Sequence, residues 1–176
     1  MGTPHAAEAR LLALLHQLDF ARRWYDLCAA TRYGKPARDL SDADAKAALE
    51  STGWTFKSHR KERFYATREG GVPGELGVNL SLVHGVAEFI LVCRVPVGHI
   101  GDVFPVIMRD VEHRFGPELP ESPPYPQPWY QGPAELRHVL AEGFGLYAEI
   151  AGAIRASGLL AGEDNGGETG VGADPS

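Results

Sequence analysis

The densest group of titratable side chains in this sequence lies between residues 99 and 113. It comprises His99, Asp102, Asp110, Glu112 and His113. Imidazole and carboxylate groups can hold a metal ion or move protons, so this region is the candidate for a small metal-dependent or His/Asp-dependent enzyme. Helix capping by Asp102, and a favourable place for His113 near a helix C-terminus, explain the same residues without chemistry. We prefer that explanation and predict no catalytic residue and no metal ligand.

Motifs that mark common enzyme classes are missing from the chain. The sequence contains no P-loop, no dinucleotide-binding fingerprint, no nucleophile elbow and no HExxH motif. We therefore expect no cofactor. The sequence leaves open whether the protein is an enzyme and favours a non-catalytic role.

A basic run beside aromatic residues suggests a second kind of chemistry. Cations and aromatic rings on neighbouring strands can hold phosphates and stack bases, so this hairpin is an alternative nucleic-acid-binding site. Its basic residues are Lys57, Arg60, Lys61 and Arg63, and its aromatic residues are Trp54, Phe56, Phe64 and Tyr65. A charged hairpin tip that protects a sheet edge explains them equally well. The net charge is −6, with 5 Lys/Arg against 14 Asp/Glu in residues 70–176, so nucleic acid is a disfavoured partner.

The stretch from Glu75 to Val95 predicts the central hairpin of the fold. His84-Gly85 suits a two-residue loop, because Gly adopts positive φ freely and His does so more often than most residues. With this loop one face of the hairpin is wholly apolar and the other is mixed, and Glu75 meets Arg94 at its open end. A register shift of one residue would exchange the two faces, so the loop and the alternation support each other.

The remaining elements complete an α+β fold. We expect one long helix over about His5 to Thr31, a short helix over 42–52 capped by Ser41, and a first hairpin in which Phe56 faces Tyr65. The two hairpins form a four-stranded antiparallel β-meander over about 54–96, with the N- and C-terminal helices on its apolar face.

A third helix and a Pro-rich connection precede the last helix. The third helix is expected to start after Asp102 and to end near Gly116, and residues 117–133 hold 7 of the 13 prolines. Pro133 opens the last helix, in which Gly143, Gly145 and Gly152 suggest close backbone packing. The aromatic residues of the Pro-rich segment serve either as a lid over the apolar sheet or as anchors for a partner, and both alternatives stay open.

Composition indicates one soluble domain. The chain has 176 residues, and we expect a single α+β domain over 1–160 followed by a disordered, Gly-rich acidic tail over 161–176. No apolar run is long enough to span a membrane, so no membrane association is expected. Cys28 and Cys93 fall on core-facing positions and are predicted to be buried thiols. Together with an N-terminus that lacks a leader pattern, this predicts a cytoplasmic protein.

The mixed sheet face leads to the functional hypothesis. A face with both polar and apolar side chains suits solvent and an interface alike. We therefore expect a non-enzymatic binding module that docks another protein of unknown identity, with homodimerisation as an alternative. Immunity proteins, inhibitors and secretion chaperones are analogues in architecture only. The predicted partner-binding residues are Asn79, Ser81, Glu88, Ile90, Val92, Tyr125, Trp129 and Tyr130.

Overall fold

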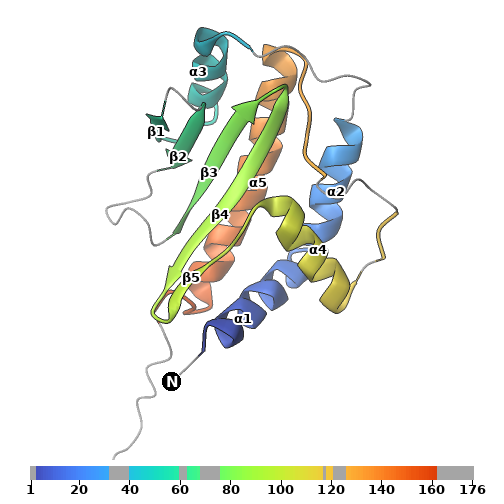
Figure 1. Ribbon diagram of the computed structural model, residues 1–176, viewed down its shortest axis with the longest axis vertical. Helices are drawn as coiled ribbons and strands as arrows, with labels where there is room; N and C mark the ends of the chain where they lie inside the picture. The colour runs from blue at the N-terminus through green and yellow to red at the C-terminus, as the bar shows by residue number, and fades with distance from the viewer. Residues whose placement is uncertain are drawn as a thin grey trace, which may run out of the picture.

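The computed structural model describes residues 3–31, 40–59, 63–67, 76–116, 118–120 and 126–161. Within these ranges the helices are α1 (Pro4–Gln17), α2 (Phe20–Ala30), α3 (Asp42–Glu50), α4 (Phe104–Phe115) and α5 (Pro133–Ala156). The strands are β1 (Phe56–His59), β2 (Phe64–Thr67), β3 (Leu76–Val83), β4 (Val86–Val95) and β5 (Gly98–Ile100). The predicted α+β class is confirmed (Figure 1).

All strands belong to one antiparallel sheet whose order follows the chain, β1-β2-β3-β4-β5. The predicted meander is therefore present, with one strand more than the four expected. The additional strand, β5, pairs with the end of β4 across a tight turn at Pro96-Val97. A strand of three residues is too short to show an alternating pattern, which is why the sequence did not reveal it.

The β3-β4 hairpin has the predicted loop and register. His84 and Gly85 both adopt positive φ, 55° and 73°, as a two-residue hairpin loop requires. Val83 faces Val86, and the pairing continues without a bulge to Leu76 and Cys93. Glu75, the expected partner of Arg94, lies outside the described residues.

The predicted register of the β1-β2 hairpin is wrong by two residues. Phe56 faces Thr67, and Tyr65 faces Ser58 rather than Phe56. His59 at the end of β1 faces Phe64 at the start of β2, and Arg63, just before β2, has a φ of 47°. A shift of two residues leaves every side chain on its expected face, so the error does not change which residues are buried.

The single long N-terminal helix was also a wrong prediction. The chain breaks at Leu18-Asp19, where Asp19 adopts a left-handed conformation with φ 53° and ψ 34°. Asp tolerates this conformation better than most residues. The break redirects α2, whose Phe20 and Trp24 are fully buried.

The other helix boundaries agree closely with the sequence patterns. Ser41 caps α3 by accepting a hydrogen bond from the Asp44 backbone N–H at 3.1 Å, and α5 starts at Pro133. The Asp102 prediction needs correction, because Asp102 Oδ1 accepts from the Val103 N–H at 2.6 Å and Val103 occupies the N-cap position of α4.

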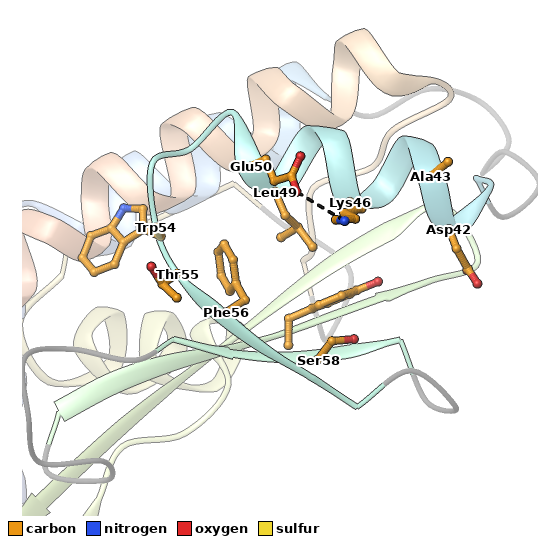
Figure 2. Close-up of a pocket in the computed structure, with 10 residues that line it drawn as sticks. Asp42, Ala43, Lys46, Leu49, Glu50, Trp54, Thr55, Phe56 and Ser58 are labelled. Atoms are coloured by element: carbon orange, nitrogen blue, oxygen red, sulfur yellow. Dashed lines mark ion pairs between the residues drawn. The ribbon is translucent and has the colours of Figure 1, made fainter.

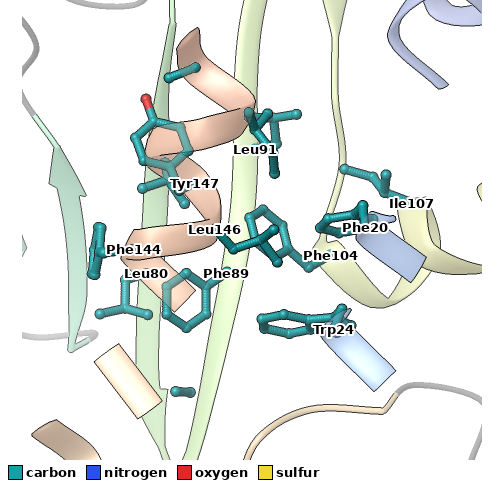
Figure 3. Close-up of a cluster of buried hydrophobic side chains, with 14 of the residues drawn as sticks. Phe20, Trp24, Leu80, Phe89, Leu91, Phe104, Ile107, Phe144, Leu146 and Tyr147 are labelled. Carbon is teal, nitrogen blue, oxygen red and sulfur yellow. The ribbon is translucent and has the colours of Figure 1, made fainter. Parts of the chain in front are cut away.

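The core lies on one side of the sheet, where an aromatic cluster joins the sheet to the helices (Figure 3). Trp24 packs edge-on against Phe89 and Phe104 at centroid distances of 5.6 and 4.9 Å. Behind Phe89, α5 comes so close that a Cβ on Gly143 would lie 2.7 Å from Phe89 Cε1. The close packing predicted for α5 is thus found at Gly143 but not at Gly145 or Gly152, where a Cβ would meet no atom within 4 Å.

Two further features bear on the environment of the protein. Cys28 and Cys93 are both buried, as predicted, and no disulfide joins them. Among the described residues, no helix combines the length and apolarity that crossing a membrane requires. The predicted tail falls almost entirely outside the described residues.

Candidate functional site

The sheet has one face that no described helix covers. Side chains on β3 and β4 alternate between fully buried and partly exposed positions, and α5 lies behind these strands in Figure 1. We call the partly exposed side the open sheet face. On β1 to β4 it consists of Lys57, Phe64, Ala66, Gly77, Asn79, Ser81, Val83, Val86, Glu88, Ile90, Val92 and Arg94.

Residues of the open sheet face form continuous rows across the strands. One row runs from Lys57 through Ala66, Asn79 and Ile90 to Val103, which makes an isolated bridge with β4. Its four strand-to-strand steps span about 19 Å. Because such rows keep neighbouring side chains in contact, the face presents one surface instead of separate spots.

Part of the Pro-rich segment borders this face along β4. Trp129 bridges to Val86, the Ala87 N–H donates to Pro128 O at 3.0 Å, and the Tyr130 N–H donates to Gly85 O at 2.9 Å. Bridge partners share a face, so Trp129 extends the open sheet face beyond Val86. The next residue, Tyr130, points the opposite way and is only 1% exposed.

Glu88 is the acidic residue of the face, and its carboxylate is held by a neighbour. Glu88 Oε1 accepts a hydrogen bond from Gln127 Nε2 at 2.7 Å. This contact fixes the Glu88 side chain against the Pro-rich segment. Partly exposed apolar side chains on the same face include Phe64 of β2 and Ile90 and Val92 of β4.

Positively charged and titratable side chains lie toward the ends of the face. Arg94 is exposed near the end of β4, and His99 of β5 pairs opposite it. Lys57 is exposed on β1, at the other edge of the sheet. The face thus combines apolar side chains of β2 and β4 with the polar Asn79 and Ser81 of β3, and cations lie at its border. Such a mixture of polar and apolar groups is usual in protein interfaces.

Most of the predicted partner-binding residues come together on this face. They are Asn79, Ser81, Glu88, Ile90, Val92 and Trp129. Tyr130 belongs to the core, and Tyr125 lies outside the described residues. The sequence did not single out Phe64, Val86 or Val103, although alternation along β2 and β4 places the first two on the same face.

The titratable residues of the 99–113 region are divided between two surfaces, and Asp110 and His113 line the same cavity. His99 lies on the open sheet face, whereas His113 lines a cavity of about 460 Å³ with residues of α1, including His5 and Glu8. Asp102 accepts a backbone hydrogen bond. Across the described ranges, no three His, Cys, Asp or Glu side chains are arranged to hold a metal ion.

The two acidic residues of α4 have different surroundings. Burial, then repulsion from Glu8 and Asp102, raises the pKa of Asp110, and His113 opposes the rise. Glu112 accepts hydrogen bonds from Arg109 at 2.7 Å and from the Leu119 N–H at 3.1 Å. It thereby fastens the end of α4 to the segment that follows. These contacts of Glu112 stabilise the fold.

The basic hairpin is only partly described, and one of its cations is already paired. Arg63 forms an ion pair with Asp42 of α3 at 3.4 Å. Lys57 lies on the open sheet face. Arg60 and Lys61 lie outside the described residues. The described part of the hairpin therefore contributes one exposed cation to any nucleic-acid surface, and such a surface depends on several phosphate contacts.

Comparison of the chain with known protein families, curated proteins and solved structures found no significant match. Function is therefore inferred from the geometry of the sheet and its surroundings.

Proposed function

We propose that this protein is a non-enzymatic, cytoplasmic protein-binding module that docks its partner on the open sheet face. One observation carries this proposal: the described helices pack against one side of the sheet, and the other side presents partly exposed apolar side chains. A face on which apolar and polar side chains alternate in this way has the mixed composition of many protein interfaces. Two buried cysteines without a disulfide fit a reducing compartment.

The size of the face bears on how the partner must bind. From Val86 to Arg94 the face is about 27 Å long, and with a width of about 19 Å it covers on the order of 500 Å². A standard interface buries about 800 Å² on each partner. The partner should therefore also contact the border that carries Trp129, which lies next to Val86.

The charges at the border indicate the chemistry of the partner surface. Lys57 and Arg94 are exposed at opposite ends of the face, and Glu88 is engaged by Gln127. Complementary charges set the orientation of two proteins and speed their encounter. The complementary surface is a mixed patch of apolar and hydrogen-bonding side chains bordered by acidic residues. Immunity proteins, inhibitors and secretion chaperones remain analogues in architecture alone.

Affinity capture with matched variants tests this proposal. Ile90→Lys and Val92→Lys place a charge in the middle of the face, whereas Ala141→Lys adds the same charge at an exposed position on α5. We expect a stoichiometric protein partner to be captured from the organism that encodes the chain by the wild type and by Ala141→Lys, even at high salt. The purified partner should bind both face variants at least 10-fold more weakly, because a buried unpaired charge is costly.

Two results would contradict the proposal. One is an unchanged affinity of the partner for the Ile90→Lys and Val92→Lys variants after circular dichroism has shown that both are folded. The other is a wild-type chain that elutes alone as a 19.0 kDa monomer, with neither partner nor nucleic acid. A dimer that Ile90→Lys dissociates would identify a second copy of the chain as the partner. Binding that weakens steeply with salt and on charge reversal at Arg60 and Lys61 would instead support nucleic acid.

A further inference from the structure

A separate cavity lies on the helix side of the sheet, between α3 and the β1-β2 hairpin (Figure 2). Its volume is about 600 Å³, within the range of roughly 300–1,000 Å³ that is common for small-molecule sites. In Figure 2, Leu49 of α3 and Phe56 of β1 point toward one another across it. Its lining includes Asp42, Lys46, Glu50, Trp54, Phe56 and Tyr65.

The aromatic walls of the cavity are held in place by the core. Trp54 packs against Phe144 and Tyr147 of α5 at centroid distances of 5.7 and 5.4 Å. Phe56 meets Phe144 edge-on at 5.4 Å. Because α5 supports these rings from behind, a flat ligand can pack against a surface that is already formed, and little side-chain entropy is lost on binding.

Tyr65 brings a polar group to this aromatic surface. The residue is 9% exposed and lines the cavity. A tyrosine combines an apolar ring with a hydroxyl that can donate a hydrogen bond. Burial, then the nearby Asp42 carboxylate, raises the pKa of Tyr65, whereas Arg63 lowers it. The phenol is therefore protonated near neutral pH and can donate a hydrogen bond.

The charged groups around the cavity are balanced in pairs. Asp42 pairs with Arg63 at 3.4 Å, and Lys46 pairs with Glu50 at 3.6 Å along α3. Each pair joins opposite charges, so neither leaves a net charge at the mouth of the cavity. An ionic ligand would lose hydration on entering an aromatic site without gaining a counter-charge. The cavity therefore favours an uncharged ligand.

We infer that the cavity between α3 and the β1-β2 hairpin binds a small uncharged molecule. This molecule carries a planar aromatic ring, which packs against Trp54 and Phe56, and a hydrogen-bond acceptor, which receives the Tyr65 hydroxyl proton. The inference is independent of the open sheet face, since the cavity lies on the opposite side of the sheet.

Three probes with the same ring system test the inference on the full chain. They are 2-acetylnaphthalene, which is neutral and carries an acceptor, naphthalene, which lacks the acceptor, and naphthalene-2-carboxylate, which is anionic. Binding is measured by saturation-transfer NMR and by titration calorimetry. We expect 2-acetylnaphthalene to bind roughly 5- to 10-fold more tightly than naphthalene, in line with one hydrogen bond. The anion should bind more weakly than the ketone.

Matched variants identify the site of binding. Tyr65→Phe removes only the hydroxyl and should reduce the affinity for 2-acetylnaphthalene to that for naphthalene. Tyr25→Phe makes the same change at a half-buried position on α2 and should leave both affinities unchanged. Ala43→Phe adds a ring at an exposed lining position of α3 and should block both probes.

The inference is overturned if 2-acetylnaphthalene binds no better than naphthalene, or if Tyr65→Phe and the wild type bind it equally. Absence of binding by all three probes also overturns it and would indicate that the chain itself fills the cavity. If Tyr65→Phe does not fold, the Ala43→Phe comparison decides, because undiminished probe binding in that variant would exclude this cavity.

Discussion

Substitution of Gly143 by alanine should destabilise the protein, although alanine is the better helix former. Gly143 lies in the interior of α5 and faces Phe89 of β4. A Cβ at this position would lie 2.7 Å from Phe89 Cε1 and 3.0 Å from Cε2. Real Cβ atoms essentially never approach another atom as closely as the first distance, so the ring or the helix must move.

The magnitude follows from two opposing contributions. Replacing Gly by Ala inside a helix stabilises by about 1 kcal/mol. Overpacking a core costs about 1–3 kcal/mol, and the upper half of this range applies because Phe89 has little room to withdraw. The centroid of the Phe89 ring lies 5.6 Å from the ring centroids of Trp24 and Phe104 and 5.5 Å from that of Phe144. The net destabilisation should therefore be about 1–2 kcal/mol.

Urea unfolding of three alanine variants checks this value. Gly145 and Gly152 lie in the same helix with open space around a Cβ, so their alanine variants should gain up to about 1 kcal/mol. In a Phe89→Leu background, the smaller side chain should remove most of the cost of Gly143→Ala, which shows that the ring is its cause. A Gly143→Ala variant as stable as Gly145→Ala would refute the reasoning.

Three further predictions concern a thiol, an ion pair and a glycine. Burial raises the pKa of Cys93 to about 11, so iodoacetamide near pH 8 should label this thiol only when the protein unfolds. Mass spectrometry of the labelled peptides checks this, and rapid labelling of Cys93 in the native chain would contradict it. Arg23 and Glu149 are 2.7 Å apart with side chains 39% and 51% exposed, so Glu149→Gln should cost under about 1 kcal/mol near pH 7. The hydrogen bond from Arg23 lowers the pKa of Glu149 from 4.5. The stability that the ion pair contributes should therefore be lost as the pH falls through the lowered pKa, which urea unfolding at a series of pH values measures. Gly101→Ala should destabilise the protein by about 1–3 kcal/mol, because φ at this position is +111° and an alanine Cβ would lie 2.5 Å from Leu91 O. Thermal unfolding measures this change, and an unchanged unfolding temperature would refute the predicted strain.

The sequence predicted those features whose cause is local. The β3-β4 hairpin followed from the His84-Gly85 loop and strict alternation, and the pairing of its described residues agrees with that prediction. The start of α5 followed from Pro133, and the cap of α3 from Ser41. In each case neighbouring residues alone specify the backbone, so no tertiary contact was needed to predict it.

The features that the sequence did not reveal depend on contacts between distant residues. The helical stripe continues through Asp19, and the break there goes with packing of Phe20 against Phe104 of α4 and of Trp24 against Phe89 of β4. Trp129 was predicted to contact a partner, but its place beside Val86 depends on a bridge across 43 positions of sequence. The cavity under α3 likewise depends on how distant elements meet, since the Tyr65 hydroxyl carries no signal in the sequence.

The two proposed binding regions share the β1-β2 hairpin and are separated by the alternation of its side chains. Phe56 and Ser58 line the cavity, whereas Lys57 belongs to the row that runs across the open sheet face through Ala66. A strand in the sheet sends successive side chains to opposite sides, so these neighbours in sequence cannot serve the same site. A change at Lys57 therefore acts on the partner surface, and a change at Ser58 acts on the cavity. The two proposals can therefore fail independently, because Ile90→Lys and Val92→Lys change the open sheet face, whereas Tyr65→Phe and Ala43→Phe change the cavity.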